Sequence, residues 1–407
     1  MKILHTADWH LGKKLEGYSR LDEQKIIMEQ INTIADEYKV DLVLICGDVF
    51  DSVNPPAEAE QLFYKSLQEL SKGGERVISI IPGNHDSPNR LVAPSPLSFS
   101  QGIIILDKPA FDIKPRPLGS HGIVDSGQGF LEMEINGENV VLLPLPYPSE
   151  SRLNTVLGEI KEERDYQKKY SQKVGEIFSR LQTNYRKDTI NIAMSHIFVD
   201  GGEESDSERP IQVGGGMAVR KNHLPAQAQY IALGHLHRGQ AVSRKRNAHY
   251  AGSPLQYSAS EMNHSKSVRI MEITPETKTD EIDIEKVKLK NPKPIETWVV
   301  EGMEGAREKL KQNQERDVWA YLKIKNSESL LQSDIKEIKN LKRDLLSIEP
   351  LTPEEFEREK QADFNQNLDI EELFEKFYRK EKETNPGEEV MDMFMKIVEN
   401  KEEENAT

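Results

Sequence analysis

Residues 42–51 read LVLICGDVFD, an apolar run of strand length that ends at Gly47 and is followed directly by the carboxylate of Asp48. Because the run is apolar throughout, it predicts a strand that is buried on both faces. A carboxylate just past the carboxyl end of such a strand lies in the crevice where α/β folds bind their ligands. Gly-Asp pairs are common in turns, so the prediction depends on what the other strands carry.

Four other strand-like runs, at residues 2–7, 77–81, 190–195 and 230–233, also lead into residues that can bind a metal ion. Ligands gather at the carboxyl ends of the strands in such sheets, so we expect these side chains to lie close together. Together with Asp48, the expected cluster consists of Asp8, His10, Asn84, His85, His196, His235 and His237.

The segments between these strands carry helical patterns. Ile27, Ile31 and Ile34 fall on one stripe, and Pro56 introduces a second amphipathic helix. Strands that alternate with helices are typical of a parallel or mixed sheet with helices packed on it. Residues 136–137 (NG) predict a hairpin in a later region of short strands. We therefore predict an α/β (α+β) fold.

We predict three regions, at residues 1–290, 291–350 and 351–407. Residues 291–294 (NPKP) mark the first boundary, and the patterns beyond it predict a small β-α-β-α-β unit. After Leu351 the chain carries 18 acidic and 8 basic residues, which account for ten of its 15 net negative charges. This acidic tail also contains two short amphipathic helical segments.

Composition restricts the class of protein. The single cysteine, Cys46, excludes an internal disulfide and suits a reducing compartment. The first residues do not resemble a signal peptide, and no run approaches the roughly 18 apolar residues of a membrane span. We therefore expect a cytoplasmic protein. The residues before the tail are nearly balanced in charge, which is compatible with a phosphate substrate.

The expected cluster combines carboxylates, a carboxamide and imidazoles without a thiolate, a set that favours Mn²⁺, Fe, Mg²⁺ or Zn²⁺. It holds too many ligands for one ion, whereas two ions about 3.5–4 Å apart would use all of them. Asp48 is the natural bridge, since its strand should lie between the others. Such a site activates a water for attack on phosphorus. His85 follows the ligand Asn84, so we expect it to point away from the metals toward the substrate, where it stabilises the transition state or protonates the leaving oxygen.

These residues lie in five spaced motifs: Asp8-x-His10, Gly47-Asp48-x-x-Asp51, Gly83-Asn84-His85-Asp86, His196 and Gly234-His235-x-His237. In this order they resemble the calcineurin-like metallophosphoesterases, and among these the family of nuclease subunits of bacterial SbcCD complexes. The resemblance implies a four-layer sandwich fold and two Mn²⁺ ions, with Mg²⁺ or another divalent ion as the alternative. It implies that Asp8, His10, Asp48 and His237 hold one ion. Asp48, Asn84, His196 and His235 would hold the other.

The resemblance also implies an activity and partners. The activity would be 3′→5′ exonuclease cleavage of double-stranded DNA and endonuclease cleavage of single strands or hairpins, in repair, recombination and replication. The tail would bind the ATPase subunit SbcC, whose ATP cycle gates cleavage. Residues 291–350 would form a capping domain that positions DNA. Homodimerisation would use helices near residues 56–70 and 90–99.

Two further carboxylates belong to the motifs. Asp51 matches bacterial members of the family, but archaeal and eukaryotic relatives often carry a histidine at this position. We therefore do not assign the role of that histidine to Asp51, and we expect Asp51 to contact the metal ligands rather than the metal. We interpret Asp86 as orienting the loop that precedes it. Candidate phosphate contacts are Lys13, Lys14, Arg20, Arg90, Arg220, Lys221 and residues 244–246.

Two other functions remain open. A phosphomonoesterase or cyclic-nucleotide phosphodiesterase could use the same fold, although the Arg-Gly of protein phosphatases is replaced here by Ser52-Val53. A metal-free scaffold for protein contacts is the alternative outside enzymes, and the complete ligand set argues against it. The remaining histidines lack motif context and are interpreted as structural or surface residues: His5, His121, His223, His249 and His264.

Overall fold

The computed structural model describes residues 1–149, 166–208, 217–325 and 330–357, and isolated positions between 374 and 394. The chain forms two compact units, Met1–Pro294 and Ile295–Thr407. Within the described residues, no helix has the length and apolar character needed to cross a membrane. Most of the acidic tail lies outside the described residues, including half of the residues in its two amphipathic stripes, so the predicted third region stays a prediction.

A six-stranded mixed sheet contains the central apolar strand. β4 (Leu42–Cys46) is buried along its whole length and pairs in parallel with β1 (Lys2–Thr6) and β5 (Val77–Ile81). The strand that precedes Asp48 therefore lies between its neighbours, as predicted. β6 (Ile103–Ile105) lies at one edge of the sheet, and the antiparallel strands β15 (Ser267–Glu272) and β16 (Ile284–Lys288) lie at the other.

An eight-stranded sheet has the order β13-β14-β12-β11-β10-β9-β8-β7. Its central strands are β10 (Glu138–Leu145), β11 (Ile190–His196) and β12 (Tyr230–Gly234), which pair in parallel. Asn136 and Gly137 both have positive φ at the turn between β9 (Phe130–Ile135) and β10, which confirms the predicted hairpin. The other strands are β7 (Arg116–Leu118), β8 (His121–Gly127), β13 (Gln240–Ser243) and β14 (Ala248–Tyr250).

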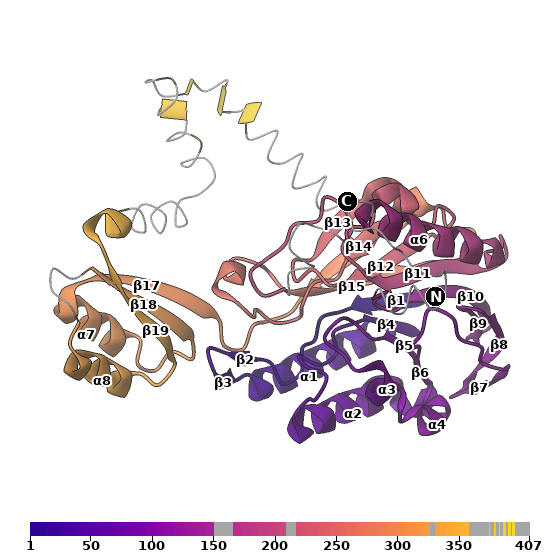
Figure 1. Ribbon diagram of the computed structural model, residues 1–407, viewed down its shortest axis with the longest axis horizontal. Helices are drawn as coiled ribbons and strands as arrows, with labels where there is room; N and C mark the ends of the chain where they lie inside the picture. The colour runs from indigo at the N-terminus through magenta and orange to yellow at the C-terminus, as the bar shows by residue number, and fades with distance from the viewer. Residues whose placement is uncertain are drawn as a thin grey trace. The chain divides into compact units, whose positions relative to one another are not determined.

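The two sheets pack face to face and are covered by helices on their outer faces (Figure 1). Helices α1 (Leu21–Glu37) and α2 (Ala57–Ser71) cover the six-stranded sheet, with the predicted stripe of Ile27, Ile31 and Ile34 in the core. Helix α6 (Tyr166–Leu181) covers the eight-stranded sheet. Apolar side chains on both faces of each sheet explain why the strands carry near-continuous apolar runs. The predicted four-layer α/β sandwich is confirmed.

Residues 240–290 contain four strands that the sequence patterns do not predict, β13 to β16. They are short, and the edge strand β16 exposes three charged residues, Glu285, Lys286 and Lys288. β15 pairs with β1, which lies more than 260 residues earlier in the chain. Strand propensity depends on such cross-strand neighbours, so a local pattern could not reveal them.

The second unit contains a three-stranded parallel sheet in the order β17-β18-β19. Its elements alternate along the chain as β17 (Ile295–Glu301), α7 (Gly302–Gln312), β18 (Trp319–Lys325), α8 (Gln332–Leu341) and β19 (Leu345–Leu351). The core of this unit is apolar, with Trp298, Leu310 and Leu322 buried in one cluster.

Candidate metal centre

The loops after β1 and β4 continue side by side beyond the ends of their strands. The amide of Asp8 donates to the carbonyl of Gly47 at 3.0 Å, and the amide of His10 donates to the carbonyl of Asp48 at 2.9 Å. Asp8, His10 and Asp48 all have φ between 45° and 54°, a left-handed conformation that L-residues seldom adopt. This backbone turns the three buried side chains toward one another instead of alternating them across the sheet.

Two motif glycines allow the close approach of neighbouring loops. A Cβ added at Gly83 would lie 2.1 Å from Oδ1 of Asp48, and one added at Gly234 would lie 1.7 Å from the carbonyl oxygen of Cys46. Neither distance is compatible with a side chain. The glycines therefore bring the loops after β5 and β12 into contact with the end of β4.

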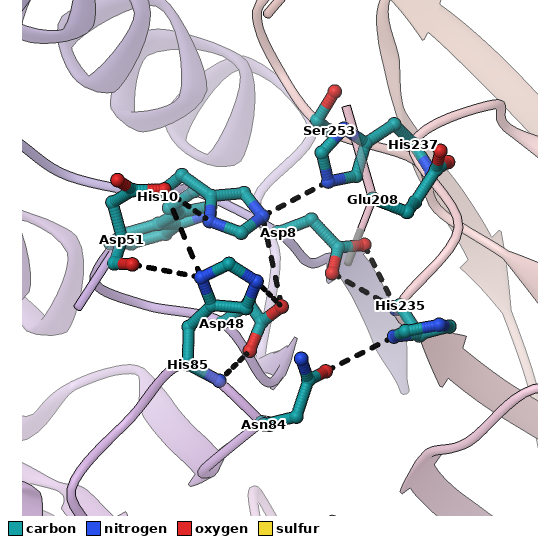
Figure 2. Close-up of polar contacts among 12 residues, drawn as sticks. Asp8, His10, Asp48, Asp51, Asn84, His85, Glu208, His235, His237 and Ser253 are labelled. Atoms are coloured by element: carbon teal, nitrogen blue, oxygen red, sulfur yellow. Dashed lines mark hydrogen bonds and ion pairs between the residues drawn. The ribbon is translucent and has the colours of Figure 1, made fainter. Parts of the chain in front are cut away.

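Asp8, His10 and His237 form the first group of potential metal ligands, with one atom from each within 4.8 Å of the others. Nε2 of His10 lies 3.0 Å from Nε2 of His237 and 3.7 Å from Oδ2 of Asp48 (Figure 2). Asp8 also accepts the amide of His235 at 2.9 Å, which connects this group to the next.

The second group consists of Asp48, His196 and His235. Nε2 of His196 lies 3.4 Å from Oδ2 of Asp48 and 2.9 Å from Oδ1 of Asn84. Nδ1 of His235 lies 3.1 Å from the same Asn84 oxygen (Figure 2). The structure thus brings together, in two groups that meet at Asp48, the seven predicted ligands.

The acceptor groups behind the imidazoles favour the tautomers in which Nε2 carries the lone pair. Nδ1 of His196 donates to the carbonyl of Cys46 at 2.9 Å, so its Nε2 is the acceptor nitrogen in the neutral ring. Nδ1 of His10 faces Asp51 at 3.4 Å, and Nδ1 of His237 faces Glu261 at 3.5 Å. Consequently the two Nε2 atoms that meet at 3.0 Å both present lone pairs, and a cation between them would relieve the repulsion.

His85 lies beside these groups rather than among their shared ligands. Its Nδ1 donates to the backbone carbonyl of Asp51 at 2.8 Å, and its Nε2 lies 3.9 Å from Oδ2 of Asp48 (Figure 2). The ring is therefore held with Nε2 toward the cluster. A third group of potential ligands, His10, Asp51 and His85, overlaps the first.

Asp86 holds the loop that carries Asn84 and His85. Its carboxylate accepts hydrogen bonds from the amides of Gly83, Val49 and Phe50 at 2.8–3.1 Å. Burial and the nearby carboxylate of Asp48 raise the pKa of Asp86 to about 6. These contacts join the loops after β4 and β5 into one rigid edge.

The electrostatics of the edge favour a bound cation. Burial lowers the pKa of His10 to about 4, so its imidazole stays neutral, the form that binds metals. Burial also opposes the charge of Asp48 and of His196, but their mutual attraction outweighs it. The pKa of Asp48 is held well below its usual range, and that of His196 is raised to about 9. The proton on His196 offsets the charge of Asp48, and a divalent cation bound by these carboxylate and imidazole donors would take its place.

Several residues around the site have no sequence signal that could have identified them. Ser207 and Glu261 contact Nδ1 of His237, and Glu208 accepts its backbone amide at 2.7 Å. They lie outside the motifs and more than 20 residues from His237 along the chain. The five other histidines take part in none of the three ligand groups found among the described residues.

One candidate phosphate contact is wrong. Arg20 is fully buried, where it donates to Glu23 at 2.7 Å and to the carbonyl of Gln256 at 2.9 Å. Its partner Gln256 lies more than 230 residues away, so the sequence could not distinguish this structural arginine from a surface one.

Comparison with known proteins agrees with the geometry. Residues 1–239 match the calcineurin-like phosphoesterase family. Over its full length the chain is 40% identical to the whole of the SbcD subunit of the nuclease SbcCD from Bacillus subtilis. It is also 32% identical, over 67% of this chain and 66% of the relative, to the same subunit from Staphylococcus epidermidis. For the same subunit from Rhodobacter capsulatus the identity is 31%, over the same shares of the two chains.

Proposed function

This chain belongs to the calcineurin-like phosphoesterases and, within them, to the family of SbcD subunits of the nuclease SbcCD, and on that basis we propose that it is a metal-dependent DNA nuclease. Its reaction is the hydrolysis of a phosphodiester with two divalent cations, for which Mn²⁺ is the metal proposed. The first cation is assigned to Asp8, His10, Asp48 and His237. The second is assigned to Asp48, Asn84, His196 and His235.

The observation that carries this proposal is the convergence of lone pairs at the end of β4. Nε2 of His10 and Nε2 of His237 meet at 3.0 Å, and Nε2 of His196 meets Oδ1 of Asn84 at 2.9 Å. Oδ2 of Asp48 lies within 3.7 Å of the His10 and His196 nitrogens, which suits a carboxylate shared by two ions.

Divalent cations in such a site lower the pKa of a bound water and neutralise the phosphate oxygens in the transition state. The residues of the chain supply orientation. Asp8 fixes the backbone of His235, and Asp48 accepts the amide of His85 at 2.9 Å, so ligand loops and the acid–base residue share one framework. Cys46, through its carbonyl, keeps the proton of His196 on Nδ1.

His85 is proposed to protonate the leaving oxygen of the cleaved phosphodiester. Its Nδ1 is anchored to the carbonyl of Asp51, so Nε2 is the nitrogen that faces the cluster. A positioned imidazole that donates a proton contributes typically about 10²–10⁴-fold to rate. Lys13, which pairs with Asp51 at 3.0 Å, adds a positive charge beside the site.

The substrate and partners are proposed from the family. Double-stranded and hairpin DNA are the proposed substrates, by exonuclease and endonuclease cleavage, in a cytoplasmic protein that acts in repair, recombination and replication. We assign binding of the SbcC ATPase to the tail at residues 351–407 and DNA positioning to residues 291–350. Homodimerisation through α2 and residues 90–99 completes the proposed assembly.

A cleavage assay tests the function. End-labelled duplex and hairpin DNA are incubated with the protein and Mn²⁺, with and without SbcC and ATP, and a phosphopeptide serves as the competing substrate. We expect Mn²⁺-dependent cleavage of DNA to exceed phosphopeptide hydrolysis by a wide margin. The reverse preference would reject the nuclease in favour of a phosphomonoesterase. The absence of bound Mn²⁺ in metal analysis would support a scaffold instead.

A further inference from the structure

A buried charged cluster lies directly behind His237. The carboxylate of Glu261 is fully buried and pairs with the ammonium of Lys266, which is also buried. Lys266 in turn donates to the backbone carbonyl of His237 at 2.9 Å and to Oγ of Ser253 at 2.8 Å. Burying an ion pair carries a desolvation cost, so such a pair is weak evidence for a contribution to stability. Its position against one ligand instead suggests a role at that ligand.

The same cluster reaches the ring of His237. Oε1 of Glu261 lies 3.5 Å from Nδ1 of His237, and Oγ of Ser207 hydrogen-bonds both of these atoms. On the other side, the carboxylate of Glu208 accepts the amide of His237 at 2.7 Å. The ring nitrogen, the amide and the carbonyl of this one residue are therefore all held by charged or hydroxyl groups; Figure 2 labels Glu208 beside His237.

A carboxylate behind an imidazole has a definite chemical effect. It keeps the proton on the near nitrogen, so the far nitrogen carries the lone pair, and it raises the basicity of that lone pair. The ammonium of Lys266 pairs directly with the carboxylate of Glu261, and Oγ of Ser207 donates a hydrogen bond to it, so the negative charge is compensated although the group is buried.

The other imidazoles have weaker support. Nδ1 of His196 donates to a backbone carbonyl, and the buried carboxylate 3.8 Å from it belongs to Asp8, which is itself a proposed ligand. The carboxylate nearest to Nδ1 of His10 belongs to Asp51, which is about one-third exposed. Nε2 of His235 has no hydrogen-bond partner among the described residues. Of the four ligand imidazoles, His237 is thus the one supported by a buried carboxylate whose charge is neutralised by a buried lysine.

We propose that Glu261 is a positioning residue that sets the affinity of one cation site selectively, the one built from Asp8, His10 and His237. Lys266 and Ser207 are its supports. The inference rests on the proposed function, because it concerns the affinity of one of the two proposed cation sites. It predicts that the two sites respond differently to a single change that leaves their shared ligand, Asp48, untouched.

The test measures Mn²⁺ binding by titration with electron paramagnetic resonance detection of the free ion. Wild type should bind two ions. Glu261→Gln should bind one ion as wild type does and the other about 10–100-fold more weakly, the usual effect of removing such a partner. DNA cleavage by Glu261→Gln should recover when Mn²⁺ is raised by the same factor, and a merely structural residue would not show that rescue.

Two further variants keep the result interpretable. Ser207→Ala removes one hydroxyl from a half-buried position and should weaken the same ion by a smaller factor. Glu132→Gln is the matched control, because Glu132 is a buried carboxylate paired with Arg186 at 2.7 Å and contacts no ligand. Its thermal stability should fall while both Mn²⁺ affinities stay at the wild-type values.

The outcomes separate this inference from the proposed function. Equal Mn²⁺ affinities in wild type and Glu261→Gln, or equal weakening of both ions, would overturn the inference alone. Wild type that binds no Mn²⁺ would overturn the proposed function and the inference with it.

Discussion

Both compact units of the chain contain parallel strands that are followed by helices. Among the described residues, however, buried titratable side chains cluster at the strand ends of the first unit only. In Met1–Pro294, Asp8 and Asp48 follow their strands and are almost fully buried. In the second unit, β17 and β18 end at Glu301 and Lys325, which pair with each other at 2.8 Å with the glutamate largely exposed to solvent. A parallel sheet therefore supplies an edge where residues meet, but does not by itself make a site.

The difference lies in the backbone just beyond the strands. Asp8, His10, Asp48 and His235 have positive φ, whereas no residue other than glycine does so in the described part of the second unit. Left-handed residues cost of order 1–3 kcal/mol each and persist where the surrounding structure holds them in place. In the first unit the left-handed residues turn their polar side chains toward one another, so the strained backbone positions the candidate metal ligands.

The strongest test of this contrast is Asp48→Asn. Asp48 faces both ligand groups, so we expect the loss of at least one ion and a fall in DNA cleavage on the order of 10³-fold, since a charge in the transition state loses its stabilisation. Glu301→Gln changes an acid at a strand end of the second unit and should leave Mn²⁺ content unchanged. Metal analysis and end-labelled DNA assays measure both. Normal cleavage by Asp48→Asn would mean that the edge of β4 is not the active site.

His85→Ala should separate chemistry from metal binding at the same edge. We expect cleavage to fall by about 10²–10⁴-fold because the proton donor is lost, while both ions and DNA binding are retained. Mn²⁺ titration and a DNA-binding assay accompany the rate measurement. If the variant also loses an ion, His85 acts as a ligand and the assigned role is wrong.

Two glycine substitutions compare backbone packing in the two units. Gly234→Ala places a Cβ 1.7 Å from the carbonyl oxygen of Cys46, so we expect destabilisation of about 1–3 kcal/mol or more. Gly305→Ala lies in α7, where the nearest atom would be Val300 Cβ at 3.7 Å, and should stabilise by about 0.5–1 kcal/mol. Urea unfolding followed separately for each unit measures both. Similar effects at the two positions would contradict the proposed role of close approach.

The last prediction concerns the stability of the two units in acid. All ten histidines precede residue 265, so the second unit contains none. Burial lowers the pKa of His249 to about 3, below the value of about 6.5 in an unfolded chain. Below about pH 6.5 the unfolded state binds a proton on His249 that the folded state does not bind. The free energy of unfolding therefore declines as the pH falls. His249→Gln should remove about 2 kcal/mol of this loss between about pH 7 and about pH 5.

Urea midpoints at several pH values measure that difference. Because the second unit lacks histidine, its midpoint should change little over the same range of pH. A variant with the same pH dependence as wild type would show that His249 takes up its proton in the folded protein.

The sequence by itself determined the apolar strands, the helical stripes and the polar residues that follow each strand. These features are local, since periodicity and the strand-end position of Asp48, Asn84 or His196 can be recognised without knowing the fold. The four-layer sandwich followed from the motifs through their resemblance to a family. The same motifs gave the expected ligands, which the structure gathers at one edge.

Only the tertiary structure decided which side chains support those ligands and how. Glu261 and Lys266 contact His237 although they lie outside every motif. Arg20 is buried, and it donates to a carbonyl more than 230 residues away in the chain. β15 becomes a strand because it pairs with β1. The physical reason is common to all three: burial and hydrogen-bond partners depend on distant segments, and a linear pattern carries no information about them.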